Sequence, residues 1–186
     1  MYSLWQNLFR PGRAEPDLDA LMQQVPLFAE LGRRERAAVA QILYRRTYEP
    51  GEVIFYQGEP GMGMYLIASG RVAIVREPEG HRLATLEAGD FFGEIALLNE
   101  TPRSATARAE TACVLWGFFQ PELLGLLERK PRLGVKILLA LARIVGARLV
   151  KADEELARCW EAAGGSPEAS SEAPAREGGA EHATVG

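Results

Sequence analysis

The hydrophobic pattern changes character along the chain. Between residues 18 and 43, apolar side chains recur at steps of three and four, which predicts two short helices. Asp17 stands where a helix N-cap is expected, and Pro26 stops the first helix. From Arg45 to Phe119 the pattern instead shows short runs of β-branched and aromatic residues between glycine-containing turns, which is typical of strands.

Eight strands are expected in this central region. Their predicted ranges are Arg45–Tyr48, Val53–Gln57, Gly63–Ala68, Arg71–Glu77, Arg82–Leu86, Asp90–Phe92, Ala105–Glu110 and Cys113–Phe119. Short strands at this spacing predict a mainly β fold with flanking helices, an eight-stranded antiparallel jelly roll (double-stranded β-helix). The mouth of such a roll can take a small ligand.

Two helices are expected after the strands. Pro121 opens the first, and Pro131 separates it from a long helix over roughly Arg132–Trp160. The long helix has two apolar stripes, one with Leu138, Leu141, Val145, Leu149, Ala152 and Leu156, the other with Val135, Leu139, Ala142 and Val150. A helix apolar on two sides is usually buried on two sides. We therefore expect one face to pack on the barrel and the other to form a homodimeric coiled coil. The alternative is a monomer whose helix lies in its own groove.

The pattern divides the chain into three segments: an arm over residues 1–16, a domain over 17–160 and a tail over 161–186. The arm has an apolar helical face, but it is short. We expect it to pack on its own domain or to fray rather than to contact a membrane. The tail has no aromatic residue and many Gly, Ala, Ser, Pro and Glu, so we expect it to be disordered.

The candidate chemistry lies in residues 91–107, FFGEIALLNETPRSATA. A short apolar helical turn after Gly93 would present unpaired N–H groups, which suit an anion. Gly93 allows close backbone approach to a ligand, and Arg103 can hold a phosphate with its forked donors. Glu94 has the wrong sign for a phosphate but can accept hydrogen bonds from sugar hydroxyls. These residues predict a sugar-phosphate site.

The same segment resembles the phosphate-binding cassette of cyclic-nucleotide-binding domains, as found in bacterial catabolite activators, protein kinase A regulatory subunits and cyclic-nucleotide-gated channels. The family pattern F-G-E, a short apolar helix and then P-R-S/A/T-A is matched at residues 92–94, 96–97 and 102–105. By this resemblance, Glu94 takes the ribose 2′-hydroxyl, Arg103 the cyclic phosphate, and Ser104 and nearby amides complete the phosphate shell. The implied ligand-binding residues are Phe92, Gly93, Glu94, Ile95, Ala96, Leu97, Arg103, Ser104, Ala105 and Arg148.

The resemblance also bears on the base of the ligand. A threonine after the cassette arginine tends to accompany cGMP in the family, and this chain has Ser104, so cAMP is the expected ligand and cGMP an alternative. Hydroxyl residues of the long helix approach adenine in the catabolite-activator branch. The corresponding positions fall near Arg148 and Leu149, and this departure leaves the base contacts open.

Composition narrows the functional classes. The net charge of −4 argues against a nucleic-acid surface, and no helix-turn-helix follows the long helix, so DNA is not an expected partner. The two cysteines, with no apolar run of membrane-spanning length and no apparent signal peptide, favour a reduced cytoplasmic setting. The two histidines stand alone, and no cysteine has a partner base, so neither a metal site nor a catalytic residue is expected.

These observations predict a cytoplasmic regulatory protein in signal transduction, not an enzyme. It would bind a cyclic nucleotide as a regulatory ligand, without a cofactor, and relay a conformational change to an unidentified downstream protein. The hinge would lie between Phe119 and Leu133. The alternative is a ligand-free interaction module that kept the fold.

Overall fold

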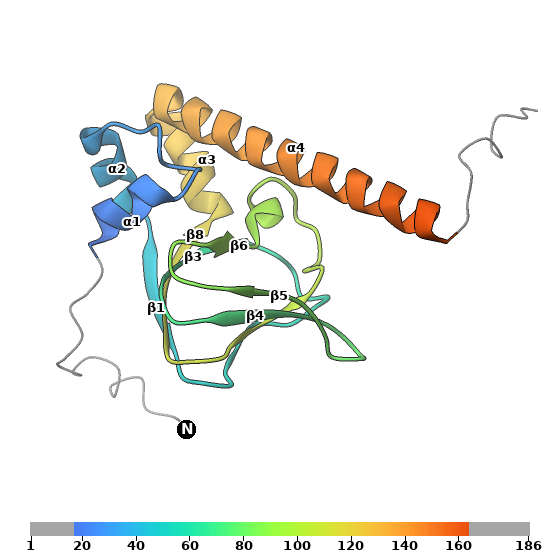
Figure 1. Ribbon diagram of the computed structural model, residues 1–186. Coiled ribbons are helices and arrows are strands. Elements are labelled where there is room, and N and C mark those ends of the chain that lie inside the picture. The colour runs from blue at the N-terminus through green and yellow to red at the C-terminus, as the bar shows by residue number, and fades with distance from the viewer. Residues whose placement is uncertain (1–16, 164–186) are drawn as a thin grey trace, which may run out of the picture. The chain divides into compact units, whose positions relative to one another are not determined.

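The computed structural model describes residues 17–163, where two four-stranded antiparallel sheets are flanked by helices (Figure 1). The helices are α1 (Leu18–Gln24), α2 (Arg33–Ala40), the 3₁₀ helix η1 (Glu94–Leu97), α3 (Gln120–Arg129) and α4 (Pro131–Ala162). The strands are β1 (Tyr44–Tyr48), β2 (Val53–Phe55), β3 (Gly63–Ser69), β4 (Val72–Arg76), β5 (His81–Leu86), β6 (Phe91–Phe92), β7 (Thr106–Ala109) and β8 (Cys113–Phe119). The predicted arm, and the predicted tail beyond residue 163, lie outside the described residues.

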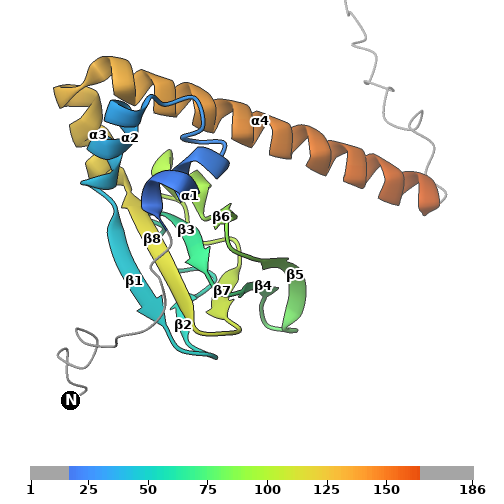
Figure 2. The same cartoon turned by 60° about the vertical axis from the view of Figure 1, so that its left-hand side comes forward.

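The strand order confirms the predicted jelly roll. One sheet has the order β1-β8-β3-β6 and the other β2-β7-β4-β5, so each sheet combines strands that are distant in sequence. Figure 2 shows β1, β8 and β3 side by side, in agreement with their antiparallel pairing. The β6–η1–β7 segment therefore leaves one sheet and enters the other, and the short helix lies at this crossing.

Two predicted elements end at least two residues earlier than expected, for local reasons. The second strand stops at Phe55 because side chains take the next amides: Tyr56 N donates to Glu59 Oε2 at 3.0 Å and Gln57 N to Thr106 Oγ1 at 3.0 Å. The second helix was expected to continue to Leu43, but it ends at Ala40. After it, the amides of residues 42 and 43 bond three residues back, a tight turn that leads into β1.

The barrel has two apolar cores. The inner core lies between the sheets and contains Ile67, Val72, Phe92, Ala107, Ala109, Cys113 and Leu115. The outer core joins helices to the β1-β8-β3-β6 sheet, with members that include Met22, Phe28, Met64, Leu97, Phe118, Leu123, Ile137 and Leu141. Leu97 of η1 and Leu123 of α3 therefore belong to one packed cluster, which links the short helix to the C-terminal helices.

Charged contacts fasten the N-terminal helices. Asp17 caps α1 by accepting from the Asp19 amide at 3.0 Å. Arg36 of α2 donates to Asp19 at 2.7 Å, and this hydrogen bond holds the pKa of Asp19 below its usual value. Glu35 accepts from Lys136 Nζ at 2.7 Å, which ties α2 to α4 and lowers the pKa of the Glu35 carboxyl.

The chain divides after Val145 into two compact units. In the first unit, Leu138, Leu141 and Val145 pack on the outer core, whereas Val135 and Leu139 are 49% and 55% exposed. One of the two apolar sides predicted for this part of α4 therefore packs within its own chain, and the contact of the other side with a second chain stays a prediction. The second unit continues α4 from Gly146, and the large apolar side chains in its described part, up to residue 163, are exposed: Leu149, Val150, Leu156 and Trp160. Among the described helices, none combines the length and the apolar character needed to cross a membrane.

Candidate anion-binding site

Gly93 shapes the start of the short helix. It adopts a left-handed conformation with φ of 77°, which only glycine adopts without strain. A Cβ at this position would lie 2.5 Å from Arg103 Nη1 and 3.2 Å from the carbonyl oxygen of Gly63. The glycine thus provides both the turn and the space in which the arginine lies.

Arg103 is buried beside this turn, with 9% of its surface exposed. Its Nη1 donates to the carbonyl oxygen of Gly93 at 3.2 Å, and its Cζ lies 4.0 Å from the ring centroid of Phe55 in a cation–π contact. Its Nε is buried and has no hydrogen-bond partner. A guanidinium stays protonated in proteins, so this position holds a positive charge with an unused donor.

Burial and the neighbouring side chains shift the pKa of Arg103 in opposite directions. Burial lowers the pKa of Arg103, while Tyr65, Glu59 and Glu94 act to raise it. Glu94 is itself only 2% exposed and stands at the first position of η1. A buried charge is tolerated only where partners compensate it, and here the compensation is incomplete because Nε has no acceptor. An anion bound beside Arg103 would supply one.

A loop that sequence analysis did not connect with the site holds the arginine's backbone. The amide of Arg103 donates to the carbonyl oxygen of Glu59 at 2.8 Å, and the amide of Gly58 donates to the carbonyl oxygen of Arg103 at 2.9 Å. A Cβ on Gly61 would lie 2.7 Å from the Ala96 Cβ, so this loop also touches η1 closely. In the sequence, only the glycines at positions 58 and 61 mark this loop, and they predict a turn without indicating that it contacts the site.

Phe55, whose ring contacts the arginine, belongs to a cluster of aromatic side chains. Phe55, Tyr65 and Phe92 lie with ring centroids 5.6 to 6.2 Å apart. Tyr65 also meets Phe119 edge-on at 6.0 Å. Burial, followed by the influence of Tyr65, raises the pKa of Tyr48 to about 12. Of these rings, sequence analysis named only Phe92 as a site residue, because the others were assigned simply to strands.

The remaining predicted residues have different environments. Phe92, Ala96, Leu97 and Ala105 are buried, whereas Ser104 is exposed and Ile95 is 48% exposed. The Ala96 amide, expected to face a phosphate, donates to the carbonyl oxygen of Gly93 at 3.2 Å. Arg148 belongs to the second unit of the chain, so its predicted role near the base stays a prediction. No group of three or more His, Cys, Asp or Glu that could hold a metal occurs in residues 17–163.

An antiparallel jelly roll with a buried, incompletely paired arginine behind a glycine turn is an arrangement suited to a small anionic ligand. Comparison with known proteins identifies the family. Residues 45–130 match the family described as Cyclic nucleotide-binding domain, and the chain therefore contains a domain of that family.

Three relatives illustrate the match. The cAMP-dependent protein kinase regulatory subunit of Yarrowia lipolytica is 41% identical over 93 residues, which are 50% of this chain and 25% of that protein. The crystal structure of Thermus thermophilus catabolite activator protein superposes with a TM-score of 0.65 at 38% identity, covering 72% of this chain and 62% of that one. The regulatory domain of Toxoplasma gondii protein kinase A with cAMP gives a TM-score of 0.54 at 26% identity, covering 58% and 42%. This chain thus spans a quarter to about three fifths of these relatives' lengths.

Proposed function

We propose that this protein is a sensor whose ligand is cAMP, bound at the cassette of residues 92–105. The observation that carries the proposal is the buried Arg103 guanidinium, whose Nε has no partner. A cyclic phosphate carries one negative charge and offers oxygens to such a donor. A charge-assisted bond of this kind is about twice as strong as a neutral one.

The second anchor in this proposal is Glu94, which would accept the ribose 2′-hydroxyl. Its carboxylate and the Arg103 guanidinium have opposite signs, and they would contact different parts of one nucleotide. Ser104 and the amide of Ala105 would add phosphate contacts next to the arginine. cAMP is preferred over cGMP because a solved relative, the Toxoplasma gondii regulatory domain, contains cAMP, and because a serine follows the arginine here.

The relay would begin in the outer core. Because Leu97 of η1 packs in the same cluster as Leu123 and Leu126 of α3, movement of the cassette toward a bound phosphate would disturb α3. Tyr44 of β1 fastens the start of α3 by donating to Glu122 Oε1 at 2.8 Å. The segment between Phe119 and Leu133 would serve as the hinge, and a downstream protein would detect the new arrangement. The protein would act as a regulator, not an enzyme, in the cytoplasm.

We propose that the protein forms a homodimer through α4. Residues 135, 139, 142, 146, 149, 153, 156 and 160 follow one another at alternating steps of four and three, the spacing of a coiled-coil seam. Five of them are large apolar residues with 49–61% of their surface exposed: Val135, Leu139, Leu149, Leu156 and Trp160. In the packed stripe of the first unit, Leu141 is fully buried and Leu138 and Val145 are partly buried against the outer core, so this side already packs within its own chain.

Calorimetric titration of the unmodified protein with cAMP, cGMP and a cyclic dinucleotide tests the proposed ligand. We expect saturable binding of one cAMP per chain and weaker binding of the other two. Tighter binding of cGMP than of cAMP would mean that cGMP is the ligand. If none of the three nucleotides binds, the protein is better explained as a ligand-free interaction module.

A further inference from the structure

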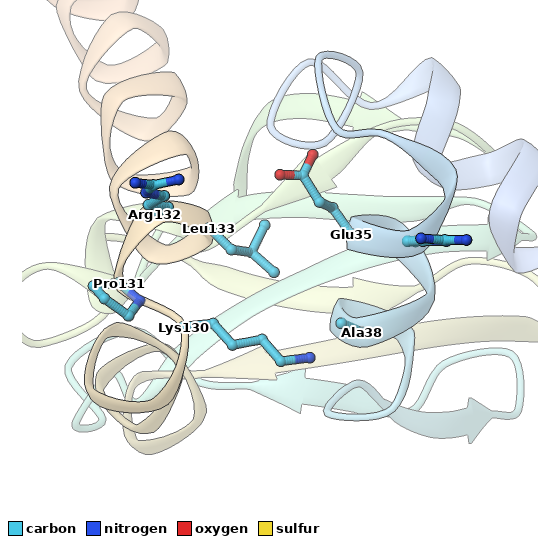
Figure 3. Close-up of a pocket in the computed structure, with 7 residues that line it drawn as sticks. Glu35, Ala38, Lys130, Pro131, Arg132 and Leu133 are labelled. Atoms are coloured by element: carbon cyan, nitrogen blue, oxygen red, sulfur yellow. The ribbon is translucent and has the colours of Figure 1, made fainter.

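A surface hollow of about 390 Å³ lies between α2 and the corner where α3 meets α4 (Figure 3). None of its lining residues belongs to the cassette. Its apolar walls come from Ala38 on α2 and from Pro131 and Leu133 on the facing corner, and Leu133 points from α4 toward α2 (Figure 3). The volume is in the range of natural binding pockets, roughly 300–1,000 Å³.

Three cations surround this apolar floor: Arg34, Lys130 and Arg132. All three side chains are exposed, and none forms an ion pair or side-chain hydrogen bond within residues 17–163. The one carboxylate of the hollow, Glu35, is already committed. Both of its oxygens accept from Lys136, at 2.7 and 3.0 Å. The hollow therefore carries an uncompensated positive charge.

The contrast with neighbouring cations strengthens this observation. Arg36 of α2 pairs with Asp19 at 2.7 Å, and Arg143 of α4 pairs with Glu30 at 3.3 Å. Lys136 pairs with Glu35. The chain as a whole is negative, with a net charge of −4. The three cations of the hollow thus lack the carboxylate partners that these neighbours have, and an external acidic group could pair with them.

We propose that this hollow docks an acidic peptide segment of a partner protein, with one apolar side chain of the segment seated on Ala38 and Leu133. The cations stand on long, exposed side chains and suit carboxylates spread along a peptide. A small anion would need convergent, fixed polar groups inside the pocket, and the lining residues here offer mainly apolar surface. The proposal goes beyond the nucleotide site and does not depend on it.

The test uses a fluorescein-labelled peptide, Glu-Glu-Leu-Phe-Glu-Glu with blocked ends, titrated with the full chain and followed by fluorescence anisotropy at low salt. We expect saturable binding that weakens as salt is added, because exposed charges are screened. A peptide with Gln in place of Glu should bind at least about tenfold more weakly, and so should one with Ser-Ser in place of Leu-Phe. Equal binding of the Ser-Ser peptide would indicate a general anion patch and overturn the proposal.

Protein variants locate the site. The triple variant Arg34→Gln, Lys130→Gln and Arg132→Gln should bind the peptide about tenfold more weakly, since each exposed pair contributes modestly. Arg34→Glu alone, which reverses one exposed charge, should also weaken binding and provides a second variant if the triple variant folds poorly.

A matched control makes the same change in charge on the barrel. It carries Arg46→Gln, Arg76→Gln and Arg108→Gln, and we expect its peptide affinity to stay within about twofold of the parent. Equal weakening in the two triple variants would attribute binding to net charge and overturn the proposal. So would the absence of saturation at about 1 mM protein, a concentration that detects even weak complexes.

Discussion

Replacing Arg103 with alanine should abolish most of the affinity for cAMP. In the proposed complex, the guanidinium makes charge-assisted bonds to the phosphate through Nε, which has no partner in the free protein, and through a terminal nitrogen. Each such bond contributes about 1.5–3 kcal/mol. Truncating one partner of a buried charge pair costs about 2–5 kcal/mol. A loss of about 3 kcal/mol corresponds to roughly 100-fold weaker binding.

Two further substitutions separate charge from geometry. Arg103→Lys keeps the charge but loses the forked donors, so it should recover only part of the affinity. Glu94→Gln keeps an acceptor for the ribose hydroxyl. The loss of cAMP binding free energy should therefore not exceed about 3 kcal/mol, the upper value for a hydrogen bond to a charged group. Arg108→Ala is the matched control, because Arg108 is an exposed arginine on the neighbouring strand β7. It should leave binding unchanged.

The assay is calorimetric titration of each variant with cAMP, with thermal melts as the folding control. Arg103→Ala removes the charge that partly compensates buried Glu94, so a somewhat lower melting temperature without ligand is expected. If Arg103→Ala folds normally and binds cAMP as tightly as the parent, then Arg103 is not the phosphate anchor. The ligand-free module would then be the better explanation of the fold.

Gly93→Ala should weaken cAMP binding in titrations and lower the melting temperature, because its φ is positive and the new Cβ would meet Arg103. The raised pKa of Tyr48 means that ionisation disfavours the folded state, so chemical denaturation should show stability falling between about pH 10 and 12, and Tyr48→Phe should reduce that fall. Leu139→Glu with Leu149→Glu should give monomers in sedimentation experiments, whereas a parent protein that is monomeric at micromolar concentration would contradict the proposed dimer. Removal of residues 164–186 should leave cAMP affinity unchanged, and a tenfold loss would mean that this segment contributes to the site.

Sequence reasoning predicted the barrel and the cassette because both depend on local signals. Glycine turns divide the strands, and the pattern of residues 92–105 is contiguous in the chain. The ends of elements were less predictable. The second strand was expected to reach Gln57, but its amides bond to Glu59 and Thr106, and the Gln57–Thr106 contact joins residues that are distant in sequence.

The environment of Arg103 could not be predicted, because it is made by contacts between distant segments. Phe55 lies in another strand, and Glu59 accepts from the Arg103 amide across a loop that reads only as a turn. Spacing along α4 likewise predicted two apolar sides but did not indicate which one packs internally. That choice depends on the outer core, into which Leu141 rather than Leu139 points.

The incompletely paired Arg103 also has a consequence for the lifetime of the protein in a cell. A buried donor without an acceptor lowers the stability of the ligand-free fold, and a ligand that binds only the folded state raises stability by about 2.7 kcal/mol at 100 times its dissociation constant. Proteases act mainly on unfolded chains. The amount of this protein should therefore rise and fall with the concentration of the proposed ligand, because degradation removes mainly the chains that have no ligand bound.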